Sequence, residues 1–260
     1  MRTVNFQYET KLVFSSPASN HRFFLRILPQ SDGRQNIKSL SWLIDPQAAA
    51  WHTSDGFGNN ALSGHINAPH GYFSFSIQGT AEITDAPYTL RAEPERALFF
   101  PTELTFPRKV LADFHNALAS SAPVDTLRRV QHFSRAVHDH LRYERGVTEN
   151  TTTAQEAFDM GAGVCQDYAH ILLALLRLSG IPCMYIAGLA SDYGETHAWV
   201  EAWIEDRYYG IDPTRDKLID SGYIALSRGR DFEDCSVERG MYKGACRGTQ
   251  TISLNMEISQ

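Results

Sequence analysis

The hydrophobic pattern of this 260-residue chain changes its period near residue 105, and the change divides the chain into two parts. Before that point, short runs of branched and aromatic residues alternate with polar ones, as Val4, Phe6 and Tyr8 do. Period-two alternation is typical of strands with one buried face. A proline-bounded connector at residues 101–107 follows, and apolar residues then recur at helical spacing. We therefore expect a β-rich domain over residues 1–105 and a second domain over residues 106–246.

The β-rich part contains several candidate strands separated by polar turn segments. Beyond the alternation near the N-terminus, they lie at residues 22–28, 39–44, 65–67, 72–78 and 80–85. Glycine and asparagine in residues 55–60 favour a turn, because both tolerate positive φ values. A last alternating segment, residues 249–258, predicts one more strand. We expect this C-terminal piece, residues 247–260, to return to the N-terminal domain.

Three segments of the second part have the features of helices. Residues 124–141 carry an apolar stripe after Pro123, and residues 153–160 begin with a threonine cap. Residues 165–178 are apolar around almost the whole circumference, which indicates a helix buried on most sides. Strand-like segments follow at residues 183–189, 197–205 and 208–212. This combination predicts an α+β fold.

The composition excludes some classes of partner. A net charge of -6 and a pI near 5.9, without a dense Lys/Arg run, exclude the electrostatic pattern of a nucleic-acid-binding protein. The N-terminus has no apolar signal core, and the longest apolar run, residues 171–176, is too short to span a bilayer. We therefore expect no membrane partner and a cytoplasmic location.

The four cysteines form no CxxC pair and no framework of the kind found in small secreted domains. They are Cys165, Cys183, Cys235 and Cys246. We expect mostly free thiols, with Cys183 packed as a small apolar side chain. Whether Cys235 and Cys246 pair stays open at this stage, although a missing signal segment argues against a disulfide.

Cys165 has the position expected of a nucleophile. It follows Gly161-Ala162-Gly163 and begins the buried helix, so its sulfur faces the unpaired N–H groups and the positive end of the helix dipole. That position favours the thiolate, which is the nucleophilic form of cysteine. The glycines also let a substrate carbonyl approach the backbone, where the Cys165 N–H can donate to a developing oxyanion.

His197 and Asp212 are the candidate partners of this thiol. His197 begins a strand, and period-two geometry places it on the same face as Trp199 and Glu201. A hairpin with its tip near residues 204–205 sets His197 opposite Asp212, whereas a tip at residues 206–207 pairs Glu201 with Asp212 instead. Asp212 is the better orienting carboxylate, because it ends a strand just before a proline.

Three motifs carry a resemblance to a known family. They are Gly163-Val164-Cys165-Gln166-Asp167-Tyr168-Ala169, His197-Ala198-Trp199-Val200-Glu201 and Asp212-Pro213-Thr214. In order and spacing they resemble the motifs of the transglutaminase-like superfamily, which is built on a papain-like fold. The first hundred residues resemble the N-terminal domain of bacterial transglutaminase-like cysteine proteases. The tail is similar too, at Gly229-Arg230-Asp231 and Arg239-Gly240.

The resemblance implies a fold and a set of roles. The fold is a papain-like core, with the cysteine-bearing helix packed on an antiparallel sheet, behind a sandwich-like β domain. Cys165 is the implied nucleophile, His197 the general acid and base, and Asp212 the orienting group. Tyr143 matches an aromatic position before the cysteine motif, and we expect Gly163, Tyr143 and Trp199 to form the oxyanion site or the site wall.

The implied activity is hydrolysis of amide or peptide bonds through an acyl-enzyme, without a metal or an organic cofactor. The alternatives are a protein-glutamine gamma-glutamyltransferase, which passes the acyl group to an amine acceptor, and a non-catalytic peptide-binding module. The substrate expected is a peptide or protein amide. His138 and His140 lie two residues apart and do not share a helix face, so they predict no metal site, and His170 is expected to be structural.

Overall fold

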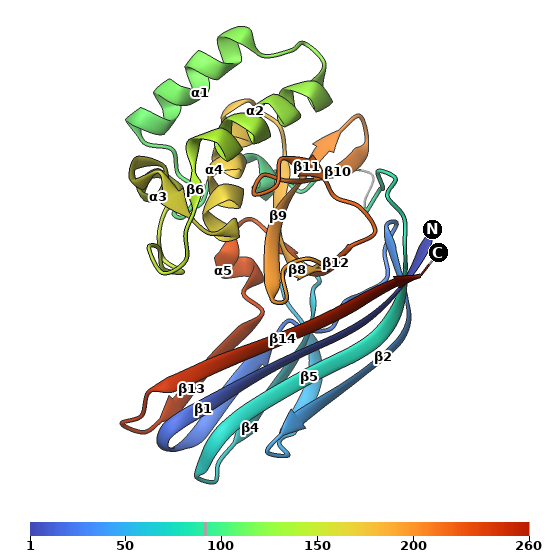
Figure 1. The fold of residues 1–260 in the computed structure, drawn as a ribbon, viewed down its shortest axis with the longest axis vertical. Helices are drawn as coiled ribbons and strands as arrows, with labels where there is room; N and C mark the ends of the chain where they lie inside the picture. Colours follow the sequence, from blue (N-terminus) through green and yellow to red (C-terminus); the bar gives the residue numbers. More distant parts are fainter. Residues whose placement is uncertain (91–92, 260) are drawn as a thin grey trace.

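One long strand, β1 (Arg2–Leu25), belongs to both sheets of the N-terminal unit (Figure 1). The structure is a computed structural model that describes residues 1–90 and 93–259. The first half of β1 lies between β5 (His70–Ile83) and β14 (Gly248–Ser259), and β2 (Gln35–Asp45) pairs with β5. The second half lies between β4 (Asn60–Ile66) and β13 (Glu238–Lys243), and β3 (Ala49–Ser54) pairs with β4. All these pairs are antiparallel.

Alternating side chains of both sheets fill a common core. Val4, Phe6 and Tyr8 point inward from the first half of β1, and Phe23 and Leu25 point inward from the second half. The register of β1 shifts between residues 13 and 22, where the strand passes from one sheet to the other. The expected sandwich-like β unit is therefore confirmed.

The strands differ in extent from those expected. Residues 72–78 and 80–85 were expected as two strands, but β5 runs through Gly79 without a break. A Cβ at Gly79 would overlap the Ser39 carbonyl oxygen and the Phe6 ring, so glycine permits close packing there rather than ending the strand. β3 and β13 were not expected, because neither alternates cleanly between buried and exposed residues.

The second unit is a five-stranded antiparallel sheet covered by helices. The strand order is β11 (Lys217–Leu218), β10 (Arg207–Asp212), β9 (Thr196–Ile204), β8 (Cys183–Ala190) and β12 (Tyr223–Gly229). Helix α4 (Cys165–Leu178) packs on β8 and β9, and its side chains from Ala169 to Leu176 are almost fully buried. The expected α+β fold, with a buried cysteine-bearing helix on an antiparallel sheet, is confirmed.

Further elements surround α4 (Figure 1). They are η1 (Arg96–Phe99), α1 (Lys109–Ser121), α2 (Thr126–His140), α3 (Ala154–Met160), α5 (Phe232–Cys235) and the parallel pair β6 (Arg142–Tyr143) and β7 (Ala162–Gly163). The sequence did not predict α1. Helix α2 begins two residues later than expected, because Asp125 caps it by accepting from the Arg128 N–H while Val124 stays exposed. Among the described residues, no helix has both the length and the apolar composition needed to cross a bilayer.

Side chains of the N-terminal unit cover the edge of the second sheet at β12. The Gln35 amide accepts from the Ala225 N–H and donates to the Ala225 carbonyl, both at 2.9 Å. The Asn59 amide bonds the N–H and the carbonyl of Arg228 in the same way, at 2.8 and 2.7 Å. These amides pair with β12 as a neighbouring strand would, so the edge strand has no unpaired backbone at these residues.

Candidate active site

Cys165 is the first residue of α4, and the turn before it is held by an acidic side chain. Asp167 accepts from the Val164 N–H and from the Thr148 hydroxyl, both at 2.7 Å. A Cβ at Gly163 would overlap the Asp167 carboxylate, so the position before Val164 requires glycine. The carboxylate therefore fixes the backbone that presents the thiol at the start of the helix.

A network of hydrogen bonds orients His197. Its Nε2 lies 2.8 Å from Asp212 Oδ2. The same oxygen accepts from the Tyr223 hydroxyl at 2.8 Å, and Oδ1 accepts from the Thr214 N–H at 2.9 Å. The His197 and Asp212 side chains have no exposed surface. Because Asp212 is held by two other donors, it fixes both the tilt of the imidazole and the position of its Nε2 proton.

The imidazole is stabilised in its charged form. Burial lowers the pKa of His197, but the hydrogen bonds and charges of Asp212 and Cys165 outweigh this effect and raise it to about 9. Burial acts to raise the pKa of Asp212, yet the bonds and charge from His197 hold it below its usual value. Cys165 lines the same groove as His197, and because Nε2 is bonded to Asp212, Nδ1 is the ring nitrogen that remains for the cysteine. The pair is thus an imidazolium and a carboxylate beside Cys165 at neutral pH.

The hairpin register differs from both alternatives given by the sequence. Ile204 pairs with Arg207, and Val200 pairs with Ile211, so the tip lies at residues 205–206. Continuing this register by one residue sets Asp212 on β10 opposite Trp199 on β9, so Asp212 is a diagonal neighbour of His197. The direct opposition of His197 and Asp212 was wrong by two residues, but diagonal neighbours on one face of a pair still lie within reach of long side chains.

Tyr193 covers the imidazole, although no motif or periodic pattern of the sequence predicts this contact. Its ring stacks on His197 with the centroids 3.8 Å apart, and the Arg215 guanidinium lies over the Tyr193 ring at 4.3 Å. Asp192 pairs with Arg215 at 2.5 Å. Tyr193 and Asp192 lie in the loop between β8 and β9, and Arg215 lies in the turn after β10. The Tyr193 ring excludes water from one side of His197. Tyr223 was missed for the same reason: both reach the site through tertiary contacts.

The remaining predicted residues lie in different places. Tyr143, on β6, pairs with Gly163 on β7 and lines the groove with Cys165. Trp199 is fully buried, packs edge-on against Tyr223 at 5.3 Å, and does not line this groove. Glu201 is fully buried, accepts a hydrogen bond from the Tyr88 hydroxyl, and lies 3.6 Å from the Arg228 guanidinium. Tyr143 and Gly163 therefore lie near Cys165. Trp199 instead packs against Tyr223, whose hydroxyl donates to Asp212.

The other histidines have structural contacts. His138 Nδ1 lies 3.1 Å from the Thr214 carbonyl oxygen, and His140 Nε2 lies 2.9 Å from that of Phe158. His170 is fully buried, and its Nε2 accepts from the Phe232 N–H at 3.2 Å. Within residues 1–90 and 93–259, no three His, Cys, Asp or Glu side chains are grouped as metal ligands would be.

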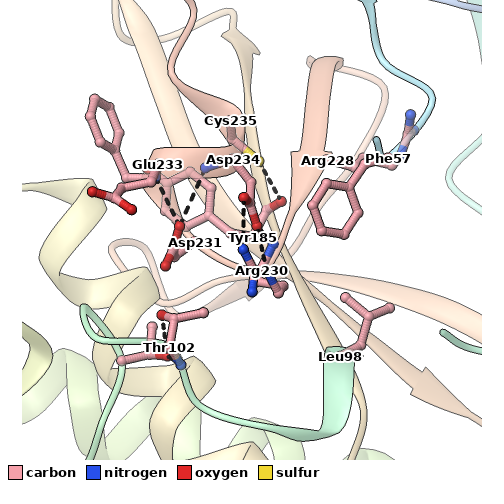
Figure 2. Close-up of polar contacts among 12 residues, drawn as sticks. Phe57, Leu98, Thr102, Tyr185, Arg228, Arg230, Asp231, Glu233, Asp234 and Cys235 are labelled. Carbon is pink, nitrogen blue, oxygen red and sulfur yellow. Dashed lines mark hydrogen bonds and ion pairs between the residues drawn. The ribbon is translucent and has the colours of Figure 1, made fainter. Parts of the chain in front are cut away.

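The remaining cysteines are free thiols and lie apart from Cys165. Cys235 ends α5, and its Sγ donates to the Tyr185 carbonyl at 3.4 Å, as Figure 2 shows. The same view shows Asp231 capping α5 by accepting from the N–H groups of Glu233 and Asp234. Burial raises the pKa of the Cys235 thiol well above its usual value. Cys235 is therefore a buried, unreactive thiol that packs in the core. Cys246 forms no disulfide and is partly exposed.

Comparison with known proteins bears on both units. Residues 113–213 match the model of the transglutaminase-like superfamily, and residues 4–82 match that of the bacterial transglutaminase-like N-terminal region. An uncharacterized protein of Mycobacterium leprae is 27% identical over 280 residues and covers 97% of each chain. An uncharacterized protein of Mycobacterium tuberculosis is 29% identical, over 83% of this chain and 79% of its own length.

A solved structure has the same overall fold. It is that of a candidate cysteine protease from Cytophaga hutchinsonii. It superposes with a TM-score of 0.80 at 19% identity, over 99% of this chain and 91% of the other. The superposition therefore includes both units.

Proposed function

Because this chain belongs to the transglutaminase-like superfamily and carries the bacterial N-terminal region of that family, we propose that it is a thiol-dependent hydrolase of amide or peptide bonds. The observation that carries the proposal is the buried His197–Asp212 pair at 2.8 Å, in one groove with a thiol at a helix N-terminus. Thiolate, imidazolium and carboxylate in this order are the components of cysteine-dependent acyl transfer.

The geometry supports a two-step mechanism. The Cys165 thiolate attacks the substrate carbonyl, and the oxygen of the tetrahedral intermediate accepts from the Cys165 N–H, which lies in the unpaired first turn of α4. The C–N bond then breaks, His197 gives its Nδ1 proton to the leaving amine, and a thioester remains on Cys165. Water attacks the thioester while Nδ1 takes its proton, and the acid product leaves.

Asp212 and Tyr193 assist without touching the reacting atoms. Asp212 keeps the Nε2 proton in place through both steps, so that Nδ1 is the nitrogen that gives and takes the proton. Tyr193 shields the ring from water, which strengthens the charge interactions in the site. The proposal assigns no step to a metal or an organic cofactor.

A mass-spectrometric assay tests the proposal. The protein is incubated with a peptide library and with glutamine-containing proteins, in the presence and absence of a primary amine. The proposal predicts products that gain one water per cleaved amide, in equal amounts with and without amine, and no product with Cys165→Ala. Amine incorporation in place of water would assign amine transfer, and a wild-type protein that binds peptides unchanged would assign a binding module.

A further inference from the structure

The groove beside Cys165 has a second wall, which comes from the N-terminal unit. The cavity is about 550 Å³ in volume and includes Cys165, Tyr143 and His197 on the core side. Its opposite side is formed by side chains of β1, β13 and β14, namely Tyr8, Leu12, Glu238, Tyr242, Gln250 and Ile252. A substrate that reaches the thiol through this groove therefore contacts both units.

Most charges in the groove are already compensated. Arg145 and Glu195 form an ion pair at 2.5 Å across the core side. His197 faces the Cys165 thiol, with Asp212 behind it. His21 is neutral near pH 7, because burial and then the neighbouring His70 lower its pKa to about 4. Each of these groups is therefore neutral or lies beside an oppositely charged group among the described residues.

Glu238 is the exception. Its carboxylate accepts from the Gln250 amide at 3.0 Å, and no described cation lies within ion-pair distance of it. Arg239, the next residue, donates to the Ser236 hydroxyl at 2.7 Å and to the Glu233 carbonyl instead. Burial, with no cation to oppose it, raises the pKa of Glu238 to about 7. A half-buried carboxylate of this kind gains stability from any cation that enters the groove.

Two tyrosines add to this preference. Tyr8 and Tyr242 line the same wall as Glu238. After burial, the charges of Glu238 and of Glu195 contribute to raising the pKa of Tyr8 to about 12, which places the phenol within electrostatic range of carboxylates from both walls. Aromatic faces beside a carboxylate favour ammonium and guanidinium groups over neutral ones.

We propose that the groove selects substrates that carry an ammonium or guanidinium group near the scissile amide, and that Glu238 is the specificity-determining residue. This inference rests on the proposed function, because it takes Cys165 as the reacting group. In this proposal the N-terminal unit selects the substrate through Glu238, and the second unit carries the reacting residues Cys165 and His197.

Charged thiol reagents test the inference without a known substrate. Aminoethyl methanethiosulfonate carries an ammonium group, and sulfonatoethyl methanethiosulfonate carries a sulfonate. With either reagent, the Cys165 thiolate attacks the sulfenyl sulfur, a disulfide forms and methanesulfinate leaves. The two rate constants are measured at Cys165 by peptide mass spectrometry above pH 8, where Glu238 is ionised, and their ratio reports the charge preference of the groove.

We expect Glu238→Gln to lower the cation-to-anion rate ratio about tenfold, and Glu238→Lys to lower it further. Glu233→Gln is the matched control, because Glu233 is exposed and outside the groove, and its ratio stays at the wild-type value. A ratio unchanged in both Glu238 variants overturns the inference. The reaction with neutral iodoacetamide, measured in each variant, shows whether the thiol site is intact.

The alkylation rates distinguish a failure of this inference from a failure of the proposed function. If wild-type Cys165 reacts with iodoacetamide no faster than the partly exposed Cys246, the proposed function fails and the inference falls with it. If Cys165 is the faster thiol but its charge preference does not depend on Glu238, the inference alone fails.

Discussion

The charge on His197 is the feature of the site that a single substitution tests most sharply. A pKa of about 9, against an ordinary value of 6.5, corresponds to about 3 kcal/mol in favour of the imidazolium. Burial opposes the charge, so the favourable part comes from Asp212 and Cys165. Asp212→Asn keeps the shape but removes one of the two charges that stabilise the ring. We expect the His197 pKa to fall by at least about one unit.

The same substitution changes how stability depends on pH. Since folding raises the pKa of His197, the imidazolium contributes its full stability below the unfolded value near 6.5. This contribution is lost as the pH rises through about 9. The free energy of unfolding of wild type, minus that of Asp212→Asn, should therefore shrink across this window. Urea unfolding at pH 6 and pH 9.5 measures this difference.

NMR titration of the His197 ring carbons reads the pKa directly. Asp216→Asn is the matched control, since Asp216 pairs with Arg135 at the surface, away from the imidazole. The reasoning is refuted if the His197 midpoint is the same in wild type and Asp212→Asn. It is equally refuted if the surface control lowers the midpoint as much.

Three further substitutions have expected outcomes. Gly163→Ala places a Cβ against the Asp167 carboxylate. It should lower the free energy of unfolding, measured in urea, by about 1–3 kcal/mol and remove most of the hydrolysis rate. Tyr193→Ala removes the ring stacked on the imidazole; diethyl pyrocarbonate should then modify His197 faster, with about 1 kcal/mol of stability lost. Gln35→Leu leaves the backbone of Ala225 without its two partners, and should lower the free energy of unfolding by about 2 kcal/mol or more.

Local patterns predicted the parts of this fold that depend on neighbours in sequence. The buried circumference of α4 and the alternation at the start of β1 both follow from periods that the side chains themselves display. Cys165 was placed at a helix start by the glycines before it and the apolar run after it, and the structure has it as the first residue of α4.

Long-range packing decided what the sequence did not predict. The hairpin register depends on how β9 and β10 pair at their tip, where Glu205 and Asp206 both adopt positive φ, and this displaced Asp212 by two residues from the expected partner. Tyr193, Tyr223 and Glu238 enter the site from a loop and from distant strands. Their sequence neighbourhoods carry no periodic signal of that position.

The most direct test of the central claim compares two thiols in one chain. Cys165 and Cys246 are both partly exposed, but Cys165 alone shares a groove with His197. With limiting iodoacetamide at pH 6, peptide mass spectrometry should find alkylation at Cys165 at least about tenfold faster than at Cys246, and this advantage should disappear in His197→Ala. Equal rates at the two cysteines, or an advantage that survives His197→Ala, would contradict the proposal that Cys165 is a nucleophile activated by His197.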